Sequence, residues 1–231
     1  MVSLVKDNRA FIKNCTNPHH YNHIGTIIGI NNNVPSFLNC DNCYHEIKND
    51  IFNFLSKNDA NLKEDLFTGC KYQCVEYSRR WLILNRRFIF GDVSCANKIF
   101  DKINFVTNVD TNKKHNLIGF TNGSTTKPEF SDILIFPVAY KQNYGHVGII
   151  TGVNLEKGFV EVSEQNNDNK WESYYSYSRR LPLIKLNDLY YIIEYRWHEG
   201  FNERYLKSNQ DINYALNRLK STIIGWKRIE V

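Results

Sequence analysis

The amino-acid sequence predicts an α+β domain in which N-terminal helices pack on an antiparallel sheet. In the first half, apolar residues recur at helical spacing in several segments, whereas the second half contains short β-branched segments. Pro137, Gly145, Gly152 and Gly158 separate these segments, and connections this short favour antiparallel neighbours. With 231 residues, 42% of them apolar, the chain can bury one sizeable core, and we expect a single domain over residues 1–231.

The distribution of charge gives no indication of a macromolecular partner. The net charge of +5 comes from 29 basic and 24 acidic residues spread along the chain, without the run of like charges typical of a nucleic-acid-binding arm. No apolar run approaches the ~20 residues that span a bilayer, and the first residues lack the apolar stretch of a signal peptide. We therefore expect a cytoplasmic protein with no nucleic-acid or membrane partner.

The six cysteines are Cys15, Cys40, Cys43, Cys70, Cys74 and Cys95. Without a secretory signal, reduced thiols are expected rather than a disulfide framework. Cys40 and Cys43 have metal-type spacing, but no second pair of ligands follows at a suitable distance. A cluster of loop histidines also lacks the spacing of a known metal motif: His19, His20 and His23. We expect no metal site.

Local patterns predict the elements of the first half. Residues 25–38 predict a hairpin, because two β-branched segments flank a turn of three asparagines. Residues 1–22 predict a short helix and a loop, and residues 44–62 and 93–103 have the apolar spacing of amphipathic helices. Residues 107–127 are rich in Asn and Lys and contain few packing residues, so we expect a loop there.

The segment around Cys74 predicts a helix that begins at this cysteine. From Val75 onward the residues are mostly good helix formers without Gly or Pro, and Tyr77, Trp81 and Leu84 recur at the spacing of a buried stripe. A thiol at a helix N-terminus is exposed to the partial positive charge of unpaired backbone N–H groups, which favours the thiolate. The alternative is that Cys74 is a small buried hydrophobe, and its position alone leaves both interpretations open.

Two further residues have the order and spacing that a cysteine hydrolase requires. Strands are predicted at residues 132–136, 146–151, 159–163 and 190–197. His146 begins the second of these strands and Glu164 follows the third, so a short antiparallel hairpin places the two side by side. Such an enzyme needs a thiolate, an imidazole within hydrogen-bonding reach and a polar group that orients the imidazole. Taken singly, such a histidine can be a core residue and such a glutamate is usually solvated.

Three motifs carry a resemblance to a known family. Residues 72–85 are similar to a nucleophile helix, residues 145–151 to a histidine strand and residues 164–166 to an acidic motif. Together they resemble the CHAP amidases, and within them the glutathionylspermidine amidase domain of glutathionylspermidine and trypanothione synthetases. The resemblance runs from about residue 25 to the C-terminus and implies a papain-like cysteine hydrolase fold. Residues 198–220 do not align with the amidase pattern, and we expect a helical insertion there.

The resemblance implies a role for each site residue. Cys74 is the expected nucleophile, His146 the general base and Glu164 its orienter. Arg79 lies where the family has an arginine that helps to organise the site, and Asn166 where a polar residue faces it. The backbone N–H of Cys74 and the side chain of Gln73 are the expected oxyanion donors. No metal or organic cofactor is required.

The expected substrate is a glutathionylspermidine-like amide between a peptide and a polyamine, cleaved through a thioester. Such a substrate needs a bipolar pocket, for which Arg79 could bind a carboxylate and Asp168 could face the polyamine. The alternative for Arg79 is a structural ion pair with a neighbouring carboxylate. Two alternative functions stay open, a peptidoglycan amidase or endopeptidase and an inactive binding module with the same fold.

Overall fold

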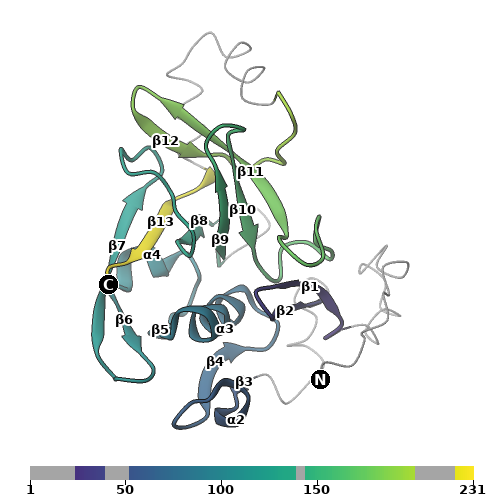
Figure 1. Cartoon of the computed structure of the whole chain (residues 1–231), viewed down its shortest axis with the longest axis vertical. Helices are drawn as coiled ribbons and strands as arrows, with labels where there is room; N and C mark the ends of the chain where they lie inside the picture. The colour runs from purple at the N-terminus through teal and green to yellow at the C-terminus, as the bar shows by residue number, and fades with distance from the viewer. Residues whose placement is uncertain (1–23, 40–51, 139–143, 201–221) are drawn as a thin grey trace.

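The computed structural model describes residues 24–39, 52–138, 144–200 and 222–231. An antiparallel sheet of nine strands forms most of this structure (Figure 1). In spatial order the strands are β12 (Leu189–Ile192), β11 (Arg179–Leu186), β10 (Phe159–Ser163), β9 (His146–Asn154), β8 (Ile133–Phe136), β13 (Gly225–Ile229), β7 (Lys114–Thr121), β6 (Phe105–Asn108) and β5 (Phe88–Phe90). All neighbouring pairs are antiparallel, and the short connections in the sequence predict this for β8, β9 and β10.

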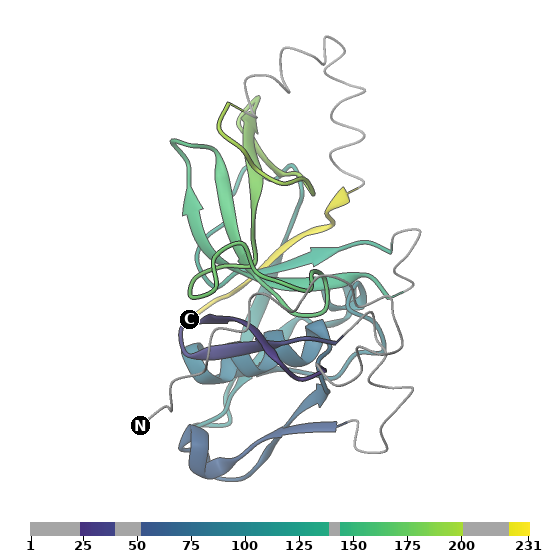
Figure 2. The ribbon, with the colours of Figure 1, turned by 90° about the vertical axis from the view of Figure 1, so that its right-hand side faces the viewer.

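One helix and two hairpins lie beside this sheet. The helix α3 (Cys74–Arg86) contacts β9 and β5 of the sheet and also β4. The first hairpin consists of β1 (Ile27–Asn31) and β2 (Val34–Phe37), and the second of β3 (Phe52–Leu55) and β4 (Leu66–Cys70). Figure 2 shows both hairpins at the same end of the molecule as α3, away from β10, β11 and β12. The helix is therefore held between the large sheet and the β3–β4 hairpin.

Alternating residues of β8 explain why the sheet is buried on both faces. Ile133 and Ile135 pack with the apolar face of α3 in one core cluster, whereas Leu134 and Phe136 belong to a second cluster on the other face. Because successive side chains of a strand point to opposite faces, a strand with four buried apolar residues needs cover on both sides. The helix provides that cover on the face of Ile133 and Ile135.

Several predicted elements differ from the structure. The helix expected at residues 44–62 is wrong in its described part, where β3 is followed by a short helix, α2 (Lys57–Ala60). Of the helix expected at residues 93–103, only α4 (Lys98–Lys102) is present. The described helices also lie between strands along the chain, so the expectation of N-terminal helices packed on a later sheet is not confirmed. Residues 1–22 and almost all of the expected insertion at 198–220 lie outside the described residues.

The loop expected at residues 107–127 is also wrong, because residues 114–121 form the inner strand β7. Only Leu117 of β7 is buried. The strand therefore does not need alternating apolar residues, and its sequence lacks the alternation that would indicate a strand. Its place in the sheet comes from backbone pairing with β6 and β13 on its two sides. The strand expected at residues 190–197 ends at Ile192. Within the described residues, no helix has the length and apolar character needed to cross a membrane.

Candidate active site

Cys74 begins α3 because the chain turns sharply out of β4. The backbone N–H of Gln73 donates to the Cys70 carbonyl over 3.1 Å, and Tyr72 takes a left-handed conformation with φ of 60°. Gly69 has φ of 136°, and a Cβ there would lie 3.3 Å from Glu76 Cα, so this position favours glycine. Gln73 is the extended N-cap residue, and Cys74 is a buried free thiol.

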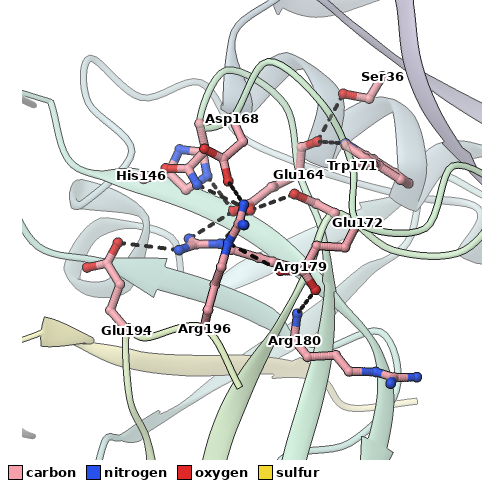
Figure 3. A network of polar contacts seen from close by, with 12 residues as sticks. Ser36, His146, Glu164, Asp168, Trp171, Glu172, Arg179, Arg180, Glu194 and Arg196 are labelled. Carbon is pink, nitrogen blue, oxygen red and sulfur yellow. Dashed lines mark hydrogen bonds and ion pairs between the residues drawn. The ribbon is translucent and has the colours of Figure 1, made fainter. Parts of the chain in front are cut away.

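The structure brings the three predicted catalytic residues together. His146 begins β9, and Glu164 follows the adjacent antiparallel strand β10, so the two side chains meet at one end of the hairpin. His146 Nε2 lies 2.8 Å from Glu164 Oε2 (Figure 3). Cys74 also interacts with His146, and Nδ1 is the ring nitrogen that Glu164 does not engage. All three side chains are buried, with exposed fractions of 8% for Cys74, 3% for His146 and 1% for Glu164.

Glu164 accepts more hydrogen bonds than the one from His146. Arg179 donates to Oε1 from Nε over 2.6 Å and to Oε2 from Nη2 over 3.2 Å, and Ser178 Oγ donates to Oε1 over 2.9 Å. The Glu164 backbone carbonyl accepts from Ser36 Oγ over 2.9 Å and from Trp171 Nε1 over 3.2 Å (Figure 3). Side chain and backbone are both held, so the carboxylate has little freedom to leave His146.

These contacts change the acidity of both residues. Burial would raise the pKa of Glu164, but the charge of Arg179 and the hydrogen bonds of His146 and Arg179 hold it far below its usual range. Burial would lower the pKa of His146, but interactions with Cys74 and Glu164 raise it to about 9. Both shifts favour a carboxylate beside an imidazolium, which is the charge state that stabilises a neighbouring thiolate.

Gln73 and Asn166 also lie at this site. Asn166 Nδ2 donates to Gln73 Oε1 over 2.9 Å, which directs the amide nitrogen of Gln73 away from Asn166. Gln165, which the sequence reasoning missed, donates from Nε2 to the Gln73 carbonyl over 3.1 Å and to Glu76 Oε2 over 2.9 Å. Its position directly after Glu164 was the only signal in the sequence. The segment after β10 is thereby fastened to the first turn of α3.

Arg79 does not join the other predicted residues. It lies five residues after Cys74, which is roughly 140° around a helix, on the side that faces β4 and β5. Its guanidinium lies over the rings of Phe67 and Phe90 at 5.4 and 5.8 Å, and Nη1 is 3.5 Å from Asp92 Oδ1. Burial lowers the pKa of Arg79 although Asp92 opposes this. The geometry therefore fits the structural ion pair better than a carboxylate-binding role at the thiol.

Asp168 is paired as well. Its Oδ2 lies 3.3 Å from Arg196 Nη2, close to the Glu164 and Arg179 pair (Figure 3). The sequence reasoning missed Arg179, which begins β11, a strand that it did not predict. Its pairing with Val162 two residues before Glu164 is visible only in the register of the sheet.

The described residues contain no group of three or more His, Cys, Asp or Glu side chains that could hold a metal ion. The candidate ligands Cys40, Cys43, His19, His20 and His23 lie outside the described residues.

Comparisons with known proteins agree with the motifs. Residues 65–166 match the CHAP domain family. The chain is 36% identical over 124 residues to the trypanothione synthetase of Crithidia fasciculata, a match that covers 53% of this chain and 19% of that protein. It is 38% identical over 104 residues to the bifunctional glutathionylspermidine synthetase/amidase of Escherichia coli, a match that covers 45% of this chain and 16% of that protein. The matches thus span less than a fifth of these relatives. The solved structure of Ly7917 aligns with 69% of the chain at a TM-score of 0.34 and 16% identity.

Proposed function

We propose that the chain is a cysteine-dependent amide hydrolase, from the match of residues 65–166 to the CHAP domain family and from the geometry of the site. The observation that carries the proposal is the buried row of Cys74, His146 and Glu164, in which the thiol lies at a helix N-terminus and the imidazole lies between thiol and carboxylate. This row supplies a nucleophile, a proton carrier and a group that orients the carrier. The site needs no metal for this chemistry.

In the first half of the reaction, the Cys74 thiolate attacks the amide carbonyl carbon and forms a C–S bond. The carbonyl oxygen becomes an oxyanion, for which the backbone N–H of Cys74 and the amide nitrogen of Gln73 are the proposed donors. The contact of Asn166 with Gln73 Oε1 supports this orientation of the Gln73 amide. When the C–N bond breaks, the His146 imidazolium gives its proton to the leaving amine.

In the second half, neutral His146 takes a proton from water as the water oxygen attacks the thioester. The C–S bond then breaks, the carboxylic acid product leaves, and the site returns to a thiolate beside an imidazolium. Glu164 holds the ring in place during both steps and stabilises its positive charge.

For the substrate we propose a glutathionylspermidine-like amide between a peptide and a polyamine. The likeness to a bifunctional glutathionylspermidine synthetase/amidase supports this class. Because Arg79 and Asp168 are each paired with an opposite charge, neither is a strong candidate for binding the substrate. We still expect Arg79→Lys to weaken turnover more than Asp168→Asn, since Arg79 is a buried residue of the helix that carries Cys74.

The test is hydrolysis of glutathionylspermidine by the whole chain, followed by mass spectrometry, with Cys74→Ala as the variant. We expect Cys74→Ala to retain less than about 1% of the activity, because the reaction needs sulfur. Cys95→Ala is the matched control, since this free thiol is not part of the row, and it should hydrolyse as the unchanged chain does. A fully active Cys74→Ala variant would contradict the mechanism, and cleavage of a peptidoglycan stem peptide alone would contradict the substrate class.

A further inference from the structure

We propose that Arg179 is a positioning residue that keeps Glu164 ionised and directed at His146, an inference that rests on the proposed function. The guanidinium binds the carboxylate with two nitrogens, Nε to Oε1 at 2.6 Å and Nη2 to Oε2 at 3.2 Å. Oε2 is also the atom that lies 2.8 Å from His146 Nε2. A two-pronged contact of this kind fixes the plane of the carboxylate and adds a permanent positive charge, which the neutral hydroxyl of Ser178 on Oε1 cannot supply.

The surroundings of Arg179 hold its guanidinium in place, and we call its two-pronged contact with Glu164 the clamp. Arg179 is 7% exposed, and its guanidinium lies 5.2 Å from the centre of the Phe136 ring. The same ring lies 5.4 Å from the ring of His146, so Phe136 supports both residues that bind Glu164. The β10–β11 register, in which Val162 pairs with Arg179, brings the arginine to the level of the site.

The charge of Arg179 has a direct consequence for the proton of His146. A carboxylate buried beside an imidazolium with no other counter-charge can take the proton and leave two neutral groups, because burial disfavours ions. The guanidinium cannot lose its proton, so it keeps Glu164 anionic over the working pH range. His146 then keeps its proton, and the thiolate of Cys74 keeps its counter-ion.

The other titratable groups near the clamp act more weakly on it. Glu194, which follows β12, lies 3.7 Å from Arg179 Nη1, and Asp168 acts on the arginine through its charge. Tyr77 of α3 interacts with Glu164 through charge only. Arg196 lies 3.3 Å from both Asp168 and Glu172 and not against Glu164. Among the described residues, Arg179 is the cation that shares both carboxylate oxygens of Glu164.

The first test measures how fast iodoacetamide alkylates Cys74 in the whole chain as a function of pH. In Arg179→Gln, Glu164 loses its counter-charge, so we expect the acid limb of the alkylation profile to move up by at least about one pH unit, a tenfold loss on that limb. Above the limb the rate should stay within about threefold of the unchanged chain. A purely structural role would lower the rate equally at every pH.

Arg180→Gln is the matched control. Arg180 is the next residue of β11, pairs with Glu161 Oε1 at 2.7 Å and 3.1 Å, and lies against the rings of Phe159 and Tyr177. Its loss removes the same charge from the same strand without touching Glu164, so the acid limb should stay in place. An acid limb that moves equally in both variants, or in neither, would overturn the proposal.

Arg179→Lys provides a second measurement that does not depend on the stability of the glutamine variant. Lysine keeps the charge but lacks the planar fork, so the acid limb should stay near that of the unchanged chain while amide turnover falls at least about tenfold. Full turnover in Arg179→Lys would show that the two-pronged contact is not needed. If Cys74 of the unchanged chain is alkylated with the pH profile of a free cysteine, that result would contradict the proposed function. The difference between the Arg179 and Arg180 variants tests the role of Arg179 separately.

Discussion

At the scale of single residues, the site depends on keeping an ionised carboxylate in the protein interior. Glu164 is 1% exposed and accepts hydrogen bonds from His146, Arg179 and Ser178. A buried ion pair contributes little net stability, but removing one partner costs about 3–5 kcal/mol because the other charge is left unpaired. The proposed function and the folding therefore depend on the same contacts.

Substitution of Glu164 separates orientation from charge. Glu164→Gln keeps a group that can orient His146, so we expect kcat/KM to fall about 10²-fold, and Glu164→Ala should lose at least about tenfold more. Both variants leave Arg179 without its carboxylate, so the melting temperature should fall in both. Hydrolysis kinetics and thermal unfolding of the same samples provide the measurement, and equal kinetic losses in the two variants would argue against an orienting role.

The raised pKa of His146 predicts the alkaline limit of activity. The ring carries its proton up to about pH 9, and above that value it cannot protonate the leaving amine. We therefore expect kcat/KM to fall as pH rises through about 9, with a plateau through neutral pH, rather than to fall near the ordinary histidine pKa. A rate profile with its alkaline limb near pH 6.5 would show that Cys74 and Glu164 do not raise the pKa of His146.

At the scale of elements, the accuracy of a prediction depends on whether its signal was local. The start of α3 at Cys74 and the strands β9 and β10 are confirmed, because helix formers and β-branched residues between turn residues act within a few positions. The closeness of His146 and Glu164 was predicted from the short hairpin that joins β9 and β10. Strand β7 was not predicted, because it is defined by backbone pairing with β6 and β13 and not by its own sequence pattern. Arg179 was not predicted because its strand, β11, was not predicted.

Gly29 of β1 connects the first hairpin to the site through close packing. A Cβ at Gly29 would lie 2.1 Å from Trp171 Cδ2, and Trp171 donates to the Glu164 carbonyl. We expect Gly29→Ala to destabilise the chain by about 1–3 kcal/mol and to reduce turnover, because the indole must move. Gly91→Ala is the control, since its nearest contact would be an ordinary 3.6 Å. Urea unfolding and hydrolysis rates measure both effects, and equal stability of the two variants would contradict the packing argument.

At the scale of the whole molecule, the sheet joins segments that are distant in the sequence. Strand β13 pairs with β7 on one side and β8 on the other, and Figure 1 shows it in yellow between them. It thus connects β5, β6 and β7 with the strands that carry His146 and Glu164. Sequence reasoning predicted an antiparallel sheet but not this insertion, because pairing between residues near 120, 135 and 226 leaves no trace in local patterns.

Trp226 tests whether the two parts of the sheet unfold as one unit. Its side chain is fully buried beside Leu134 and Ile150, so Trp226→Ala should lower the free energy of unfolding by about 3–5 kcal/mol. Because β13 contacts both parts, circular dichroism and the accessibility of Cys74 to alkylation should report the same urea midpoint, shifted equally in the variant. Ile118→Ala is the control on β7, where the side chain is 39% exposed, and it should change stability by no more than about 0.5 kcal/mol. Two separate transitions, or a Trp226→Ala variant as stable as Ile118→Ala, would show that β13 does not hold the sheet together and that the site is stabilised by α3 and its hairpins alone.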